Sequence, residues 1–226
     1  MPIAGRGATQ VTSGARVWPA SLIAWSPAGD RLAFASVRAG RPLVWVADVD
    51  DGRLTAFART RISSARGHLA WAPGSLIAYQ RHDHHNVNFL DPSTGDERPL
   101  IADTTSTFFF APKYSPDGTR LAVWRNQRLW IFDLRSVTDA TVVGVVRRGE
   151  FPLGWSADGR YVYTAGQTLH RVDTRRSRTP EPIITLPFRE ADCTPAGPRR
   201  PNAFICAAFD FVSDVWMIEN FDRGTP

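Results

Sequence analysis

The stretch YSPDGTRLAVWRNQRLWIFD, residues 114–133, contains the pattern that decides the fold. An aromatic residue leads into Ser-Pro-Asp-Gly, where proline fixes φ and glycine permits a positive φ, as a tight turn between strands requires. The segments RLAVWR and RLWIFD that follow are rich in β-branched and aromatic residues, and the second ends on Asp133. The stretch therefore predicts a hairpin turn followed by two neighbouring strands.

The same pattern recurs along the chain. The turn phrase returns as WSPAGD from Trp25, WAPGS from Trp71, WSADGR from Trp155 and CTPAGP from Cys193, with steps of 46, 43, 41 and 38 residues between first positions. A second column ends on Asp48, Asp91, Asp133, Asp173 and Glu219, at steps of 43, 42, 40 and 46. Two columns that keep one period of about 42 residues indicate internal repeats. Four short strands in each period are typical of a β-propeller.

The sequence predicts an all-β fold, a β-propeller of about five four-stranded blades, in a single domain spanning residues 1–226. The fifth repeat ends before a fourth strand, whereas the N-terminus supplies a spare one at residues 8–13. We therefore predict that this N-terminal strand pairs with residues 215–220 and closes the last blade, because an open sheet edge favours aggregation. The alternative is a C-terminal fragment of a larger propeller whose earlier blades are missing.

Both repeat columns are interpreted as structural. Six of the eight tryptophans fall in them, which predicts packing between sheets: Trp25, Trp71, Trp155, Trp45, Trp130 and Trp216. His170 replaces tryptophan in its column, so we expect it to pack in the same way. Each aspartate of the second column ends a strand and opens a turn, where its carboxylate can accept hydrogen bonds from backbone amides.

Composition excludes several classes of protein. Hydrophobic residues make up 43% and charged residues 22%, as in ordinary globular domains. The net charge is +5, but the arginines are spread along the chain, so we do not expect a nucleic-acid partner. No apolar run approaches the ~20 residues of a membrane span, and the first residues lack a signal-peptide core. The compartment stays open: cytoplasmic or, within a longer chain, periplasmic.

The phrase Ser-Pro-Asp-Gly followed by Arg-Leu-Ala, at residues 114–122, resembles TolB-type, WD-repeat-like bacterial propellers. The ending is more specific: Phe204-Ile205-Cys206, then Ser213 to Trp216, then Glu219 to Asp222, is similar to the last blade of the C-terminal propellers of bacterial signalling proteins, including serine/threonine kinases and winged-helix regulators. The resemblance implies a module for sensing or protein binding. This chain departs from that arrangement because it carries no attached effector.

Motifs for catalysis are missing from the sequence. There is no phosphate-binding glycine loop with its lysine, no kinase catalytic loop, no Gly-x-Ser-x-Gly and no His-Glu-x-x-His. We therefore expect a non-enzymatic sensor or scaffold domain, without a cofactor, that binds a protein or peptide on the face where the blades connect. The alternatives are a small-ligand or metal-binding propeller, and the accessory gating propeller of a prolyl-oligopeptidase-like peptidase. The oligomeric state stays open.

One loop has unusual chemistry. His82, Asp83, His84 and His85 lie between the second and third strands of repeat two, and imidazole and carboxylate at this density can bind zinc, nickel or copper. Asn86 and Asn88 would be the nearest polar neighbours. The structural alternative is an exposed polar hairpin, since protein metal sites usually collect ligands from separate elements.

The two cysteines exclude a disulfide scaffold. Alignment with the first repeat places Cys206 two or three residues beyond the position opposite Cys193, so a bridge between them would need distorted geometry.

Overall fold

The computed structural model describes residues 16–17, 23–38, 41–51, 53–57, 68–74, 76–81, 86–100, 109–136, 140–145, 150–175, 179–186, 191–195, 203–208 and 215–219. The described elements are all β-strands, and each repeat found in the sequence forms one antiparallel sheet. None of the described residues belongs to a helix of the length and apolarity that crossing a bilayer would require.

The strands follow the repeat order. The first sheet contains β1 (Arg16–Val17), β2 (Ile23–Trp25), β3 (Arg31–Arg38), β4 (Arg41–Asp48) and β5 (Leu54–Phe57). The second contains β6 (Leu69–Trp71), β7 (Ile77–Gln80), β8 (Val87–Leu90) and β9 (Glu97–Pro99). The third contains β10 (Phe109–Tyr114), β11 (Arg120–Arg125), β12 (Arg128–Asp133) and β13 (Ala140–Val145).

The fourth sheet contains β14 (Phe151–Trp155), β15 (Tyr161–Ala165), β16 (Thr168–Asp173) and β17 (Glu181–Thr185). In the fifth, the described strands are β18 (Ala191–Pro195), β19 (Ala203–Ala208) and β20 (Val215–Glu219). The predicted four-strand repeat is therefore confirmed in sheets two to four.

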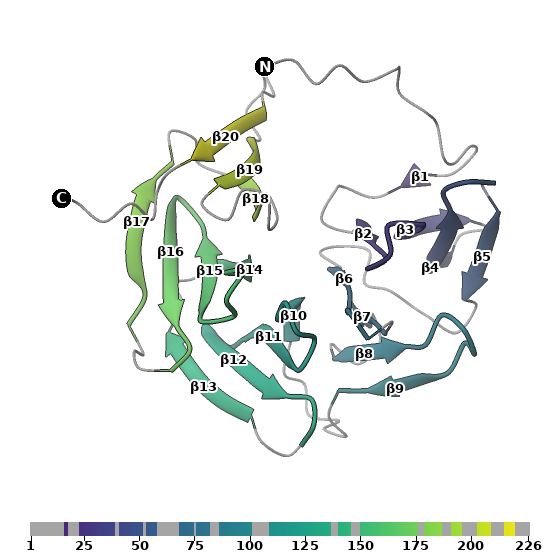
Figure 1. Cartoon of the computed structure of the whole chain (residues 1–226), viewed down its shortest axis with the longest axis horizontal. Helices are drawn as coiled ribbons and strands as arrows, with labels where there is room; N and C mark the ends of the chain where they lie inside the picture. Colours follow the sequence, from purple (N-terminus) through teal and green to yellow (C-terminus); the bar gives the residue numbers. More distant parts are fainter. Residues whose placement is uncertain are drawn as a thin grey trace.

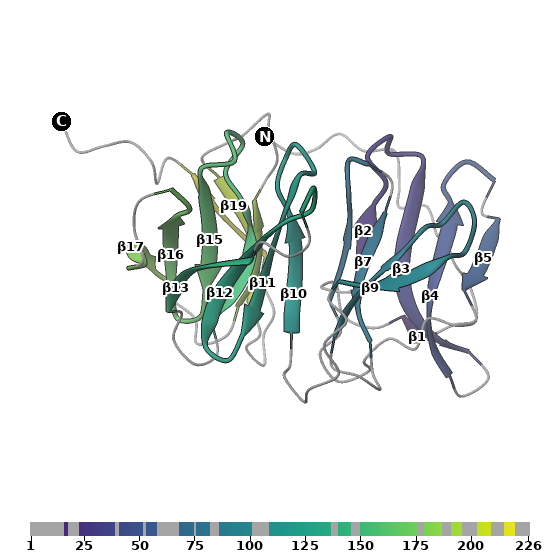
Figure 2. The ribbon, with the colours of Figure 1, turned by 90° about the horizontal axis from the view of Figure 1, so that it is seen from below.

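The sheets are arranged around a common centre (Figure 1). The first strand of each repeat is innermost, and these strands contact one another in order: β2 with β6, β6 with β10, β10 with β14, and β14 with β18. Seen from the side, the inner strands run roughly along the central axis (Figure 2). Among the described strands, β18 and β2 make no contact as extensive as these. Residues 8–13, which we predict to close the last sheet, lie outside the described residues.

The hydrophobic core lies between successive sheets. One buried cluster joins each neighbouring pair, for example Ala122, Leu129 and Trp155 between the third and fourth sheets. The fourth and fifth sheets meet through Tyr163 and Phe204, whose rings make an edge contact with centroids 4.9 Å apart. Apolar burial thus connects each sheet to the next.

The inner strand of the first sheet differs from the sequence prediction. We expected one segment leading into the Trp25 phrase, but two short strands pair with β3 on the same side. Residues of β1 lie opposite Ser36 and Val37, whereas β2 lies opposite Leu32 to Phe34. The inner edge of this sheet is therefore built from two pieces.

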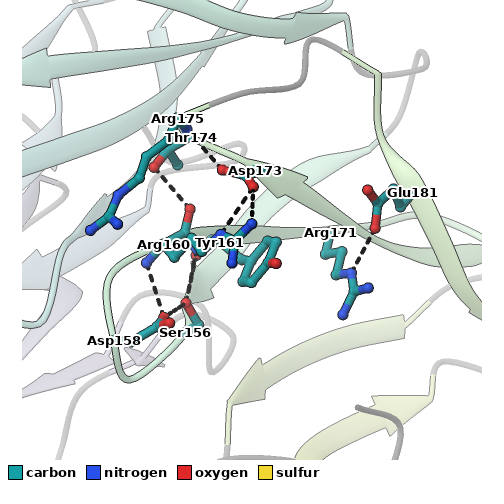
Figure 3. Close-up of polar contacts among 9 residues, drawn as sticks. All are labelled: Ser156, Asp158, Arg160, Tyr161, Arg171, Asp173, Thr174, Arg175 and Glu181. Atoms are coloured by element: carbon teal, nitrogen blue, oxygen red, sulfur yellow. Dashed lines mark hydrogen bonds and ion pairs between the residues drawn. The ribbon is translucent and has the colours of Figure 1, made fainter. Parts of the chain in front are cut away.

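The turn phrase has one geometry in three sheets. The amide of serine donates to the backbone carbonyl five residues on, and the serine Oγ accepts from the amide of that same residue: Ser26 with Arg31, Ser115 with Arg120, and Ser156 with Tyr161. The glycines have φ of 77° at Gly29, 71° at Gly118 and 67° at Gly159, a region that favours glycine. Figure 3 shows this turn in the fourth sheet, where Ser156 also donates to Asp158 at 2.6 Å.

The aspartate column caps the turns, as predicted. In four sheets the carboxylate accepts from the backbone amide two residues on: Asp48 from Asp50, Asp91 from Ser93, Asp133 from Arg135, and Asp173 from Arg175. Asp173 additionally pairs with Arg160, whose Nη2 and Nε lie 2.8 and 3.0 Å from Oδ2 (Figure 3). These four acids therefore hold local turns.

One of these carboxylates gives a pH prediction. The side chain of Arg135 donates from Nε and Nη2 to Asp133 at 3.0 and 2.6 Å, and this lowers the pKa of Asp133 to about 2. Because the folded-state pKa lies below the unfolded value of about 3.9, the stabilisation is present above about pH 4 and is lost as the pH falls through about 2. In Arg135→Ala we expect the pKa of Asp133 to rise toward 3.8 in a carboxyl ¹³C NMR titration. The pKa of Asp158, which the Ser156 hydroxyl lowers, should not move; an unchanged Asp133 would contradict the assignment.

The first tryptophan column packs between sheets at two of its three positions. Trp71 and Trp155 are 8% and 6% exposed, and an arginine of the preceding sheet covers each: Arg31 over Trp71 at 5.2 Å and Arg120 over Trp155 at 4.6 Å. The prediction is wrong for Trp25, which is 56% exposed. Among the described strands, β2 contacts β3 and β6, and the indole of Trp25 is largely open to solvent.

The second tryptophan column is partly buried where the structure describes its side chains. Trp130 packs against the cluster between the second and third sheets, with Arg125 over its ring at 5.3 Å, and Trp45 is also partly buried. His170 is buried at its position in the same column, as predicted. The side chain of Trp216 lies outside the described part of the structure.

The expected register of the cysteines is wrong. Cys193 on β18 lies directly opposite Cys206 on β19. In the first sheet, the residues equivalent to this pair are Trp25 and Leu32, seven positions apart, whereas the cysteines are 13 apart. The longer connection between β18 and β19 moves the partner position along the chain, and an alignment on the first repeat could not take this into account.

Candidate functional site at the channel mouth

Three aromatic side chains from three sheets meet at one end of the ring of inner strands. His68 directly precedes β6, Trp124 lies near the end of β11, and Phe151 begins β14. The ring centroids are 6.2 Å apart for His68 and Phe151, and 5.7 Å apart for Trp124 and Phe151. We call these three residues the mouth cluster.

The mouth cluster crosses the axis of this ring. His68 belongs to the second sheet and Phe151 to the fourth, and these sheets are separated by the third (Figure 1). A contact between them must therefore extend over the centre of the ring. Since each inner strand runs from this end into its turn phrase, the cluster lies on the blade-connection face, opposite the Ser-Pro-Asp-Gly turns.

A buried glutamate–histidine contact lies directly beside the cluster. Glu150 is 5% exposed and His170 is 7% exposed, and Oε1 of the glutamate lies 3.6 Å from Nδ1 of the histidine. Taking a carboxylate out of water costs several kcal/mol unless a partner compensates. Glu150 immediately precedes Phe151, so this pair fixes the start of β14 and with it the position of the Phe151 ring. We interpret Glu150 and His170 as positioning residues for the mouth cluster.

Arginines stand at hairpin ends on the same face as the mouth cluster. The hairpin between the second and third strands of a sheet points to this face, and in three successive sheets it begins or ends on arginine: Arg38, Arg41, Arg81, Arg125 and Arg128. Arg128 is exposed, and Asn126 and Gln127 beside it form a two-residue turn with φ of 50° and 60°. We call Arg81, Arg125 and Arg128, whose side chains the structure describes, the arginine rim. Cations on the same face as apolar rings suit a ligand with both negative and aromatic groups.

The predicted metal loop lies outside the described residues. His82, Asp83, His84 and His85 connect Arg81 to Asn86, and the amide of Arg81 donates to the carbonyl of Asn86 at 2.8 Å. Asn86 is buried and its Oδ1 accepts from the amide of Val87 at 2.8 Å, while Asn88 is buried within β8. In the described segments there is no group of three or more His, Cys, Asp or Glu side chains that could hold a metal.

A second hollow lies on the opposite, turn face of the second sheet. It has a volume of about 240 Å³ and is lined by Leu76, Phe89, Asp91, Asp96, Glu97 and Arg98. Its polar groups serve the fold: Asp91 accepts from Ser93, and the hydroxyl of Tyr79 donates to Glu97 Oε2 at 2.6 Å. Burial, followed by the hydrogen bond to Glu97, raises the pKa of Tyr79 far above its usual range. This hollow therefore offers a ligand fewer polar groups than the mouth cluster and the arginine rim do.

Sequence reasoning missed most of the mouth. It assigned His170 to packing in the tryptophan column and gave no role to Trp124, Glu150 or Phe151. A signal was present, since Phe109 and Phe151 occupy the same place in the repeat, the first position of an inner strand. Only the arrangement of the sheets around a common centre shows that the first positions of the inner strands lie close together.

Comparison with solved structures identifies the class of fold. No protein-family model matches the sequence, and a comparison with curated proteins finds no match. The solved structures that are similar show that this chain is a TolB-like β-propeller. TolB from Acinetobacter baumannii has a TM-score of 0.70 and 14% identity over 92% of this chain and 53% of its own. The chain thus spans about half the length of that protein.

Other propellers are also similar. A putative TolB from Agrobacterium tumefaciens has a TM-score of 0.70 and 17% identity, over 89% of this chain and 77% of its own. An oligogalacturonate lyase in complex with manganese has a TM-score of 0.61 and 14% identity, over 82% of this chain and 57% of its own. At these identities the likeness concerns the fold alone.

Proposed function

We propose that this propeller is a non-enzymatic sensor or scaffold domain that binds a segment of a protein or peptide on its blade-connection face. The observation that carries the proposal is the mouth cluster with the arginine rim on the same face. Aromatic rings give large contact areas at low entropic cost, and arginines recognise carboxylates bidentately. The ligand is therefore a segment with an aromatic or aliphatic side chain for the mouth and carboxylates for the rim.

The mouth cluster also helps to weigh the two alternative functions, a gating propeller and a metal-binding propeller. A gating propeller of a prolyl-oligopeptidase-like peptidase needs a passage for its substrate, whereas the His68–Phe151 contact crosses the ring at this end. This contact supports binding at the surface. The metal-binding alternative rests on His82, Asp83, His84 and His85, which lie outside the described residues.

Selection of peptides on the purified protein tests the proposal. We expect a random displayed library to yield peptides that combine Asp or Glu with an aromatic residue, with an affinity that falls as salt is raised. Arg128→Glu should weaken such a peptide at least tenfold, because an exposed rim cation is reversed. The matched control is Arg53→Glu on the turn face, whose side chain is 73% exposed, and it should bind as the unmodified protein does.

Two further measurements complete the test of peptide binding. Phe151→Ala, confirmed as folded by circular dichroism, should lose binding at least tenfold as well. Equal affinity in both arginine variants, or failure to enrich any peptide, would contradict the proposal. Binding that requires zinc and disappears with a chelator would favour the His82–His85 alternative instead.

We also propose that the ring consists of five blades and that residues 8–13 complete the last one. The fifth sheet has three described strands, with β20 at its outer side, while the other four sheets each have four or five. A strand added along β20 would satisfy its outward amides and carbonyls. In this arrangement the N-terminal segment gives the last sheet four strands, as in the second, third and fourth sheets.

A further inference from the structure

The fifth sheet replaces a repeated side-chain pair with two cysteines. In the other four sheets, an aromatic residue at the end of the inner strand lies opposite an aliphatic residue of the next strand: Trp25 and Leu32, Trp71 and Ile77, Tyr114 and Leu121, Trp155 and Val162. In the fifth, these two register positions are Cys193 and Cys206. They are the chain's two cysteines, and both stand at one repeated pair of positions.

The backbone geometry at this pair suits a covalent bond. Directly opposite residues of an antiparallel pair have Cα atoms roughly 4.5–5.5 Å apart, which lies within the roughly 4.4–6.8 Å range of disulfides. The register of β18 and β19 is continuous over five residue pairs, from Ala191 opposite Ala208 to Pro195 opposite Phe204. By contrast, a bulge interrupts the equivalent strand pairs of the third and fourth sheets.

At two other joints, an arginine covers the aromatic residue that stands at this position. Arg31 and Arg120 each cover the tryptophan of the following sheet, and Arg120 Nη2 also donates to the carbonyl of Gly159 at 2.6 Å. In the fourth sheet, Tyr161 stands at the position of Arg31 and Arg120, and the neighbouring Arg160 covers its ring at 4.8 Å and pairs with Asp173. In the fifth sheet, Cys193 stands at the position that Trp71 and Trp155 hold in theirs.

We propose that Cys193 and Cys206 form a cross-strand disulfide that fixes the β18–β19 hairpin. The oxidant is a low-molecular-weight disulfide such as oxidised glutathione. One cysteine thiolate attacks it and releases a glutathione thiolate, and the second cysteine then attacks the mixed disulfide and releases another. Two protein thiols become one disulfide while one glutathione disulfide becomes two thiols, so electrons and protons balance.

Peptide mapping of the unmodified protein tests the bond directly. Trypsin cleaves after Arg189 and Arg199, which places Cys193 and Cys206 in different peptides. After equilibration with oxidised glutathione, we expect one linked peptide pair and a protein mass lower by two hydrogen atoms. Treatment with a reductant should separate the pair. Free thiols in the oxidised sample, or a bond between two protein molecules seen as a doubled mass without reductant, would overturn the proposal.

Thermal melting provides the second measurement. Closing a loop of about 14 residues should raise Tm of the oxidised protein by roughly 6–12 °C over the reduced one. Cys193→Ser and Cys206→Ser should each melt like the reduced protein, with no response to reductant. A melting temperature of the unmodified protein that is the same with and without reductant would contradict the proposed bond even if both serine variants failed to fold.

Discussion

Replacement of Trp155 by alanine should lower the free energy of unfolding by about 3–5 kcal/mol, as is usual for a buried aromatic residue. The indole is 6% exposed and belongs to the core between the third and fourth sheets. Its Nε1 donates to the carbonyl of Lys113 at 2.9 Å, and Arg120 lies over its ring at 4.6 Å. The substitution therefore removes apolar contact, a hydrogen bond and a cation–π contact across one joint.

Trp25 provides a matched control, because it holds the same place in the repeat. Its side chain is 56% exposed, so Trp25→Ala should cost less than about 1 kcal/mol. Urea denaturation monitored by circular dichroism measures both variants. Similar losses at the two positions would mean that the sheet preceding Trp25 covers it after all, and that burial does not distinguish these two members of the column.

Deletion of residues 1–14 should cost several kcal/mol, a large share of the ~5–15 kcal/mol typical of a domain. If residues 8–13 pair with Val215–Glu219 as proposed, the deletion exposes the edge of β20 and removes the strand that closes the ring. The truncated protein should melt at a much lower temperature and aggregate, as light scattering would detect.

Point substitutions in the full chain distinguish whether residues 8–13 form a paired strand or only a tail that keeps the protein soluble. In an alternating strand, Val11→Asp should destabilise the protein, while replacement of its neighbour Gln10 should change the free energy of unfolding by less than about 0.5 kcal/mol. A truncated protein with an unchanged melting temperature would contradict closure by the N-terminus. That result would favour the alternative of a larger ring.

The repeats could be recognised in the sequence because the residues of each turn interact with residues only a few positions away in the chain. Ser115, Asp117 and Gly118 form their turn through contacts within a few residues, so the phrase alone predicted each hairpin. The capping role of Asp133 and its equivalents was predictable for the same reason. The strand order in each sheet then followed from the repeat, because successive short strands pair with their neighbours.

Contacts between sheets were harder to predict. Trp25 and Trp155 share one sequence context, but Trp155 packs beneath Arg120 of the preceding sheet and Trp25 is largely open to solvent. The register of Cys206 depended on the length of a connection that the repeat pattern does not specify. The mouth cluster depends on how far apart the second and fourth sheets lie, which is a property of the whole ring.

The place of Trp124 in the mouth cluster has an optical consequence. An indole changes its emission when water or charge near it changes, and this indole touches the Phe151 ring at the centre of the mouth. The buried indoles of Trp71 and Trp155 lie at the other end of the inner strands, beneath arginines. Occupancy of the mouth should therefore alter a part of the intrinsic fluorescence that Trp124→Phe removes. A peptide bound at the mouth, as proposed, should therefore be detectable without a label.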